Sequence, residues 1–131
     1  MTGLLAVLAA VAHVQVTCAV QLPIRADAVY DIRNEVIILR QDDCERLQLL
    51  QAGARPRNQY RQQEFAQAVW LFAHEWAHAR GVPELSPETD VLADCTGMRT
   101  MGRVSAALGV RPEYAEVLHG YAQAALYDEC G

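Results

Sequence analysis

The chain has 131 residues, of which 52% are hydrophobic and 21% charged, and its formal net charge is −5. This length suits a single domain, residues 1–131, with a modest hydrophobic core, and no internal repeat or low-complexity segment interrupts it. All eleven basic residues are arginine, and they form no basic stripe. The composition therefore argues against nucleic acid as the main partner.

The first dozen residues, MTGLLAVLAAVA, are apolar and uncharged. They lack the basic start of a secretory signal, although residues 10–12 and 17–19 would suit a cleavage site. The run is also too short to span a bilayer, so we expect no stable membrane insertion. Two interpretations of residues 1–19 stay open: a signal segment, or a first helix packed on the domain.

The next part of the chain has the patterns of a small sheet. Residues 14–20 alternate between apolar and other side chains, which predicts a strand. The stretch AVYDIRNEVIILR, residues 28–40, predicts two short strands joined by a turn at 31–34. The continuous apolar run at 36–39 predicts burial on both faces of its strand. Residues 41–51 favour a helix, followed by a loop that contains Gly and Pro.

The remainder of the chain is helical in pattern. In residues 60–80 apolar side chains recur at spacings of three and four, and Gly81 supplies a stop signal. The next helix is expected to have Ser86 as its N-cap and to end at Gly109, and residues 111–130 form the last helix. A sheet of about three strands followed by helices, the last two forming a C-terminal hairpin, makes the predicted fold class α+β.

The segment WLFAHEWAHARG places His74 and His78 four residues apart, with Glu75 directly after the first. On a helix the two imidazoles stand one turn apart on one face, where both can reach a single zinc ion at about 2.0–2.1 Å. Glu75 points about a quarter-turn away, where it can act on a metal-bound water as general base. Burying these groups in an apolar helix would be costly without a partner, which favours a metal site over a core helix.

A catalytic zinc site needs a third protein ligand and one open coordination position. The segment after the histidines offers Glu84, Glu88, Asp90 and Asp94. In DVLAD, Asp90 and Asp94 lie one helical turn apart, so one carboxylate can bind metal while the other accepts a hydrogen bond from a ligand histidine. The simpler interpretation of Glu88 and Asp90 is that they stabilise a helix N-terminus.

These motifs resemble a known class of enzyme. AHEWAH followed by DVLADC resembles the gluzincin type of zincin metallopeptidase, whose second motif reads ExxAD or ExxxD. YDIRNEVIIL, a helix and then HExxH also resemble the small ImmA/IrrE-type metallopeptidases. The resemblance covers roughly residues 14–98. It implies that His74, His78 and Asp90 bind zinc, that Glu75 is the base, and that Asp94 supports a ligand histidine from behind.

The resemblance has two departures and one rival. Asp90 stands where Glu is usual, and only eleven residues separate it from His78. HEWAHARGVPE also fits the metzincin spacing HExxHxxGxx, with Glu84 where a histidine or aspartate would stand, although Pro83 and the missing third histidine disfavour it. Asp90 is the preferred third ligand and Glu84 the alternative.

The predicted function is a zinc-dependent metallopeptidase that hydrolyses a peptide or protein, with one Zn²⁺ as cofactor. His119 and Tyr121, on the last helix, are candidate donors to the transition state, although packing or surface roles explain them more simply. The substrate is expected to pair with an edge strand near residues 35–39. The alternative is an inactive zincin-like binding or regulatory protein that uses its sheet edge, and a metal-free helical interaction domain is a weaker third interpretation.

The four cysteines contain no CxxC pair, so a cysteine zinc site is not expected. One of three connectivities joins Cys95 to Cys130 and Cys18 to Cys44, and free buried thiols are an equal alternative. If residues 1–19 are a signal and the cysteines are paired, the protein is secreted or periplasmic; otherwise it is cytoplasmic. Cleavage after residue 19 would leave three cysteines, which favours a retained N-terminal segment.

Overall fold

The computed structural model describes residues 3–22, 26–84 and 87–130 of the chain. The elements in chain order are α1 (Leu4–Ala12), β1 (Gln15–Ala19), β2 (Ala28–Asp31), β3 (Val36–Arg40), α2 (Gln41–Gln51), α3 (Gln59–Ala79), α4 (Pro87–Ala107), α5 (Pro112–Ala125) and α6 (Tyr127–Cys130). The predicted α+β class with three strands is confirmed. The expected N-cap, Ser86, lies outside the described residues.

The sheet is mixed, with strand order β1-β3-β2; β3 pairs in parallel with β1 and antiparallel with β2. Ile37 and Leu39, on one face of β3, are fully buried, while on the other face Val36 is buried and Ile38 half-buried. The central strand is thus covered on one face and largely covered on the other, which explains its continuous apolar run. In the turn between β2 and β3, the carboxylate of Asp31 accepts hydrogen bonds from the backbone amides of Arg33 and Asn34. The β2–β3 hairpin was thus predictable from local sequence.

The prediction that a substrate pairs near residues 35–39 is wrong. Those residues belong to β3 or its approach, and β3 already has a neighbour on both sides. Its backbone groups are therefore used within the sheet and cannot accept another strand. The two edge strands of the sheet are β1 and β2, and β2 is the edge strand that packs against α3.

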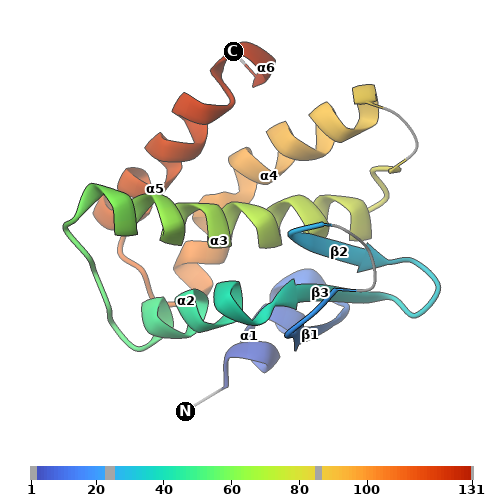
Figure 1. Cartoon of the computed structure of the whole chain (residues 1–131), viewed down its shortest axis with the longest axis horizontal. Coiled ribbons are helices and arrows are strands. Elements are labelled where there is room, and N and C mark those ends of the chain that lie inside the picture. The colour runs from blue at the N-terminus through green and yellow to red at the C-terminus, as the bar shows by residue number, and fades with distance from the viewer. Residues whose placement is uncertain (1–2, 23–25, 85–86, 131) are drawn as a thin grey trace.

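Helix α3 runs through the middle of the molecule (Figure 1), with the sheet along its C-terminal half and α4 and α5 on its other side. It contacts α2, α4, α5 and both strands of the hairpin. Residues 71–78 are buried without interruption, as expected of a helix that is covered all round. The segment with HExxH is thus the structural centre of the protein.

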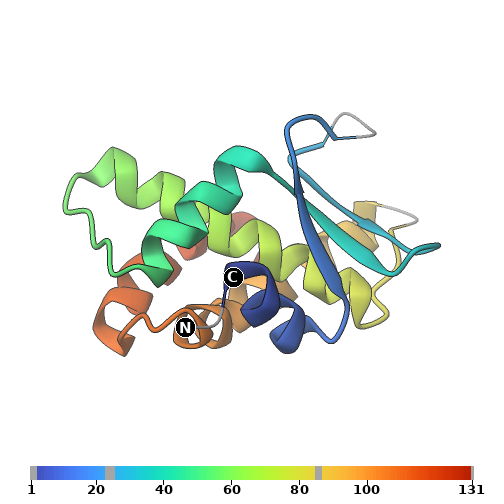
Figure 2. The ribbon, with the colours of Figure 1, turned by 90° about the horizontal axis from the view of Figure 1, so that it is seen from below.

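Helix α1 packs on the domain through a single stripe of buried residues, Leu4, Leu8 and Ala12. It contacts β1, α2 and α4 (Figure 2). Residues Leu4–Ala12 thus form a helix that packs on the domain, and a signal role of residues 1–19 stays a prediction. None of the described helices is both long and apolar enough to cross a membrane.

Two disulfides join the cysteines, Cys18 to Cys44 and Cys95 to Cys130. The first connects β1 to α2 and the second connects α4 to α6. This is the connectivity that the positions of the cysteines suggested, and the alternative of free thiols is wrong. Stable disulfides are characteristic of oxidising compartments.

The role of α1 in the core can be tested within that helix. We expect Leu8→Ala to lower the free energy of unfolding by about 2–5 kcal/mol, because Leu8 is fully buried. Leu5→Ala is the matched control: Leu5 is 41% exposed, and its loss should change stability by about 0.5 kcal/mol or less. Urea denaturation measures both, and equal effects would contradict a packed α1.

Candidate metal centre

Helices α3 and α4 approach each other very closely at Gly97. A Cβ atom added to Gly97 would lie 2.9 Å from the backbone nitrogen of His74 and 3.0 Å from its Cα atom. Only glycine allows two helix backbones to come so near. Beside this contact, the indole Nε1 of Trp70 donates a hydrogen bond of 3.1 Å to the carbonyl oxygen of Asp94. The crossing carries the first turns of α4 over the histidines of α3.

The ring of His78 is oriented by the turn that ends α3. Gly81 has a positive φ of 111°, and its amide donates to the carbonyl of His78. The turned chain brings the carbonyl oxygen of Val82 to 2.7 Å from Nδ1 of His78. Because a carbonyl oxygen only accepts, this contact places the hydrogen of a neutral His78 on Nδ1. Its Nε2 then carries a free lone pair, as a metal ligand requires.

His74 is oriented from the other side, by α4. Its Nδ1 lies 2.8 Å from Oδ1 of Asp94, although the N–H direction lies outside hydrogen-bond geometry. Burial, followed by the nearby His78, lowers the pKa of His74, so the ring is held neutral. The Nε2 atoms of the two histidines face each other at 3.2 Å. Two lone pairs at that distance repel unless a cation or a proton lies between them.

Asp90 completes a triangle with the two histidines. Its Oδ1 lies 3.5 Å from Nε2 of His74 and 3.8 Å from Nε2 of His78, and the third side is the 3.2 Å between the imidazoles. Ligands at zinc distance on a tetrahedron are separated by about 3.3–3.4 Å. The side chain of Asp90 is 60% exposed, so this corner of the site faces solvent. His74, His78 and their acidic neighbours are close enough to hold a metal ion.

Glu84, the alternative third ligand, is less well placed. Its Oε1 lies 3.6 Å from Nε2 of His78, and its nearest cluster contains His78 and Glu75. Among the described residues, no cluster joins Glu84 to both histidines. The distances therefore favour Asp90 over Glu84 as the third ligand, because Asp90 lies near both imidazoles.

Glu75 is buried between the histidines and the hairpin. Its Oε2 lies 3.7 Å from Nε2 of His74, and its Oε1 has no hydrogen-bond partner among the described residues. Burial is the main cause that raises the pKa of Glu75 to about 8, and the charge of Glu84 adds to it. A hydrogen bond from the backbone amide of Tyr30 in β2 acts in the opposite direction. A carboxyl group with such a pKa can both accept and release a proton near neutral pH.

Asp94 lies on the Nδ1 side of His74, where the resemblance to gluzincins implies it, and it has a neighbour that the sequence did not reveal. Glu129, in α6, forms a side-chain hydrogen bond with Asp94. Burial first, and then this contact, raise the pKa of Asp94 to about 7. A signal for Glu129 was present, because it precedes Cys130 while Asp94 precedes Cys95, so the disulfide makes them neighbours.

The proposed transition-state donors are not assembled with these groups. The hydroxyl of Tyr121 donates a 2.7 Å hydrogen bond to Gln62, which lies about 18 Å from His74 along α3. His119 is half-buried on the same helix, α5, and within the described residues no contact connects it to the histidine pair. Tyr121 packs against the core and bonds Gln62, whereas a role of His119 stays a prediction.

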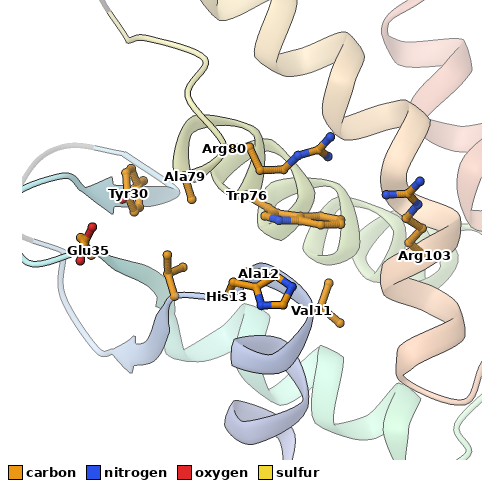
Figure 3. A pocket seen from close by; sticks show the side chains of 10 residues that line it. Val11, Ala12, His13, Tyr30, Glu35, Trp76, Ala79, Arg80 and Arg103 are labelled. Carbon is orange, nitrogen blue, oxygen red and sulfur yellow. The ribbon is translucent and has the colours of Figure 1, made fainter.

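The cavity beside β1 and the hairpin is a separate feature. It has a volume of about 660 Å³ and is lined in part by Trp76, Arg80 and Arg103, which are shown in Figure 3. Neither His74 nor His78 lines it. Trp76 and Arg80 lie two residues after each histidine, about 200° around the helix, so the cavity opens on the opposite side of α3.

No protein-family model, curated protein or solved structure matches this chain. The chemistry and geometry of the described residues are therefore the basis on which a function can be inferred.

The close helix crossing can be tested with two glycines of α4. We expect Gly97→Ala to lower the free energy of unfolding by about 1–3 kcal/mol and to weaken metal binding, because the added methyl group forces the two backbones apart. Gly102→Ala is the control: its Cβ would meet nothing within 4 Å, and the change should stabilise the helix by about 0.5–1 kcal/mol. Urea denaturation and metal titration of both variants check this.

The burial of Glu75 predicts a pH dependence in metal-free protein. With a pKa of about 8 when folded against 4.5 as its ordinary value, Glu75 takes up a proton on folding. The contribution of this proton uptake to the free energy of unfolding is therefore complete below about pH 4.5 and is lost as pH rises to 8. Over that range the free energy of unfolding falls by at most about 1.4 kcal/mol per pH unit. Unfolding in chelator between pH 5.5 and 7.5 should show a shallower decline for Glu75→Gln than for wild type. Parallel curves would contradict the assignment.

Proposed function

We propose that this protein is a zinc metallopeptidase that hydrolyses peptide bonds in a peptide or protein substrate. The observation that carries the proposal is the triangle of His74 Nε2, His78 Nε2 and Asp90 Oδ1, with sides of 3.2, 3.5 and 3.8 Å. Two nitrogen donors and one oxygen donor with a solvent-facing side are typical of catalytic zinc sites. The likeness of HEWAH and DVLAD to the motifs of gluzincins agrees with this set.

The residues around the triangle have complementary roles. When bound, a zinc ion would polarise the scissile carbonyl and lower the pKa of a water ligand toward ~7. Glu75, whose carboxylate is beside His74, would act as general base toward a water at this site and would carry its proton to the leaving amine. The carbonyl of Val82 orients the imidazole of His78, and the carboxylate of Asp94 lies 2.8 Å from Nδ1 of His74, on the side away from the Nε2 atoms that face each other.

The substrate binds along β2. This strand is an edge of the sheet and packs against α3, and an extended peptide can add to such an edge through main-chain hydrogen bonds. The backbone amide of Tyr30 points to Glu75, which supports a location of this edge beside the reacting groups. The two disulfides support a secreted or periplasmic location.

Metal content and turnover of four variants test the proposed function. His78→Ala should lose zinc, because it removes one of two nitrogen donors. Glu75→Gln should keep zinc but lose turnover of a casein or peptide-library substrate by roughly 10²–10⁴-fold, because it removes the base. An inactive binding protein would show no turnover in either wild type or Glu75→Gln.

The third ligand is tested by Asp90→Ala beside Glu84→Ala. We expect the first to lose zinc affinity and the second to keep it, because only Asp90 lies near both imidazoles. The opposite result would transfer the ligand role to Glu84. Full zinc content in His78→Ala would show that the metal binds elsewhere.

A further inference from the structure

The C-terminal helix α6 follows α5 directly, contacts α4 and α5, and is joined to α4 by a disulfide. It has four residues, Tyr127–Cys130, and none of them is buried. A single helical turn has no stability of its own, so its position depends on its attachments. Its strongest attachment is the disulfide from Cys130 to the buried Cys95 of α4.

This disulfide lies directly beside the candidate metal centre. Cys95 follows Asp94, and Cys130 follows Glu129, so the bond brings the two carboxyl groups into their mutual hydrogen bond. Asp94 in turn lies 2.8 Å from Nδ1 of His74. The geometric support for the contact between the two carboxyl groups is the cross-link itself, which joins the residues that directly follow Asp94 and Glu129 at a Cα–Cα distance of 5.5 Å.

We propose that Glu129 is a positioning residue for the metal centre, that the Cys95–Cys130 disulfide holds it in place, and that a dithiol reductant therefore weakens metal binding. The inference rests on the proposed function. Glu129 acts through Asp94, whose carboxylate lies against the ring of His74. Loss of a residue that contacts the non-ligand nitrogen of a metal-binding histidine typically lowers metal affinity by about 10–100-fold.

The chemical step is thiol–disulfide exchange. A thiolate of the reductant attacks one sulfur of Cys95–Cys130 and forms a mixed disulfide, and the second thiol of the reductant then displaces the remaining cysteine. The reductant leaves as its own disulfide, and Cys95 and Cys130 each gain one electron and one proton. Helix α6 then loses its covalent cross-link to α4, and Glu129 leaves Asp94.

The protein contains its own control, the Cys18–Cys44 disulfide. It joins β1 to α2, and neither element carries a proposed metal ligand. The experiment measures zinc affinity of the full chain by competition with a chelating dye. It compares wild type, Cys95→Ser/Cys130→Ser and Cys18→Ser/Cys44→Ser. We expect the first double variant to bind zinc about 10-fold more weakly and the second, if folded by circular dichroism, to keep wild-type affinity.

Three single variants of α6 keep both disulfides and separate positioning from stability. We expect Glu129→Ala to weaken zinc binding about 10-fold without loss of folding, since Glu129 is exposed. Glu129→Gln, whose amide can still donate a hydrogen bond to Asp94, should keep the zinc affinity of the wild type. Asp128→Asn removes a neighbouring charge and should have no effect.

The outcomes distinguish this inference from the proposed function. If wild type binds no zinc, or binds it equally with His78→Ala, the proposed function fails. If wild type binds zinc through His78 but Glu129→Ala and Cys95→Ser/Cys130→Ser bind it equally well, the positioning role of Glu129 is overturned while the proposed function stands. Equal weakening in both disulfide variants would also overturn it, because that indicates a general loss of stability.

Discussion

The contact on which the candidate site depends is the crossing of α3 and α4 at Gly97. The backbone of α4 lies so near His74 that a single methyl group at this position would meet the nitrogen and Cα atoms of His74 at 2.9 and 3.0 Å. The histidines belong to α3 and the aspartates to α4, so the separation of the two helices sets every distance between them. A side chain at Gly97 would move both carboxylates away from the imidazoles together.

The site brings together several polar groups that are costly to desolvate. Glu75 and Asp94 have pKa values raised to about 8 and about 7, mainly by burial, and two imidazole nitrogens face each other at 3.2 Å. Structural cores rarely place such groups together, because each must be desolvated without full compensation. Groups of this kind are typical of functional sites, where a ligand or reaction provides the missing partner.

The two disulfides have different neighbours, and this difference gives them different consequences. Cys18–Cys44 connects the sheet to α2 and constrains the fold. Cys95–Cys130 adds a carboxyl group from the end of the chain to the residues behind His74. In the proposed function, the imidazole of His74 is thus influenced through Asp94 by Glu129, which lies near the end of the chain. This influence depends on the Cys95–Cys130 disulfide, which a reductant can break.

The sequence by itself determined the local features of this protein. The hairpin, the helix with HExxH and its end at Gly81, and the pairing of Asp90 with Asp94 all follow from interactions between residues a few positions apart, which spacing reveals. Tertiary structure alone decided which strand is central, that Tyr121 bonds Gln62 far from His74, and that Glu129 reaches Asp94. These depend on how the elements pack, and periodicity contains no information on the register between distant segments.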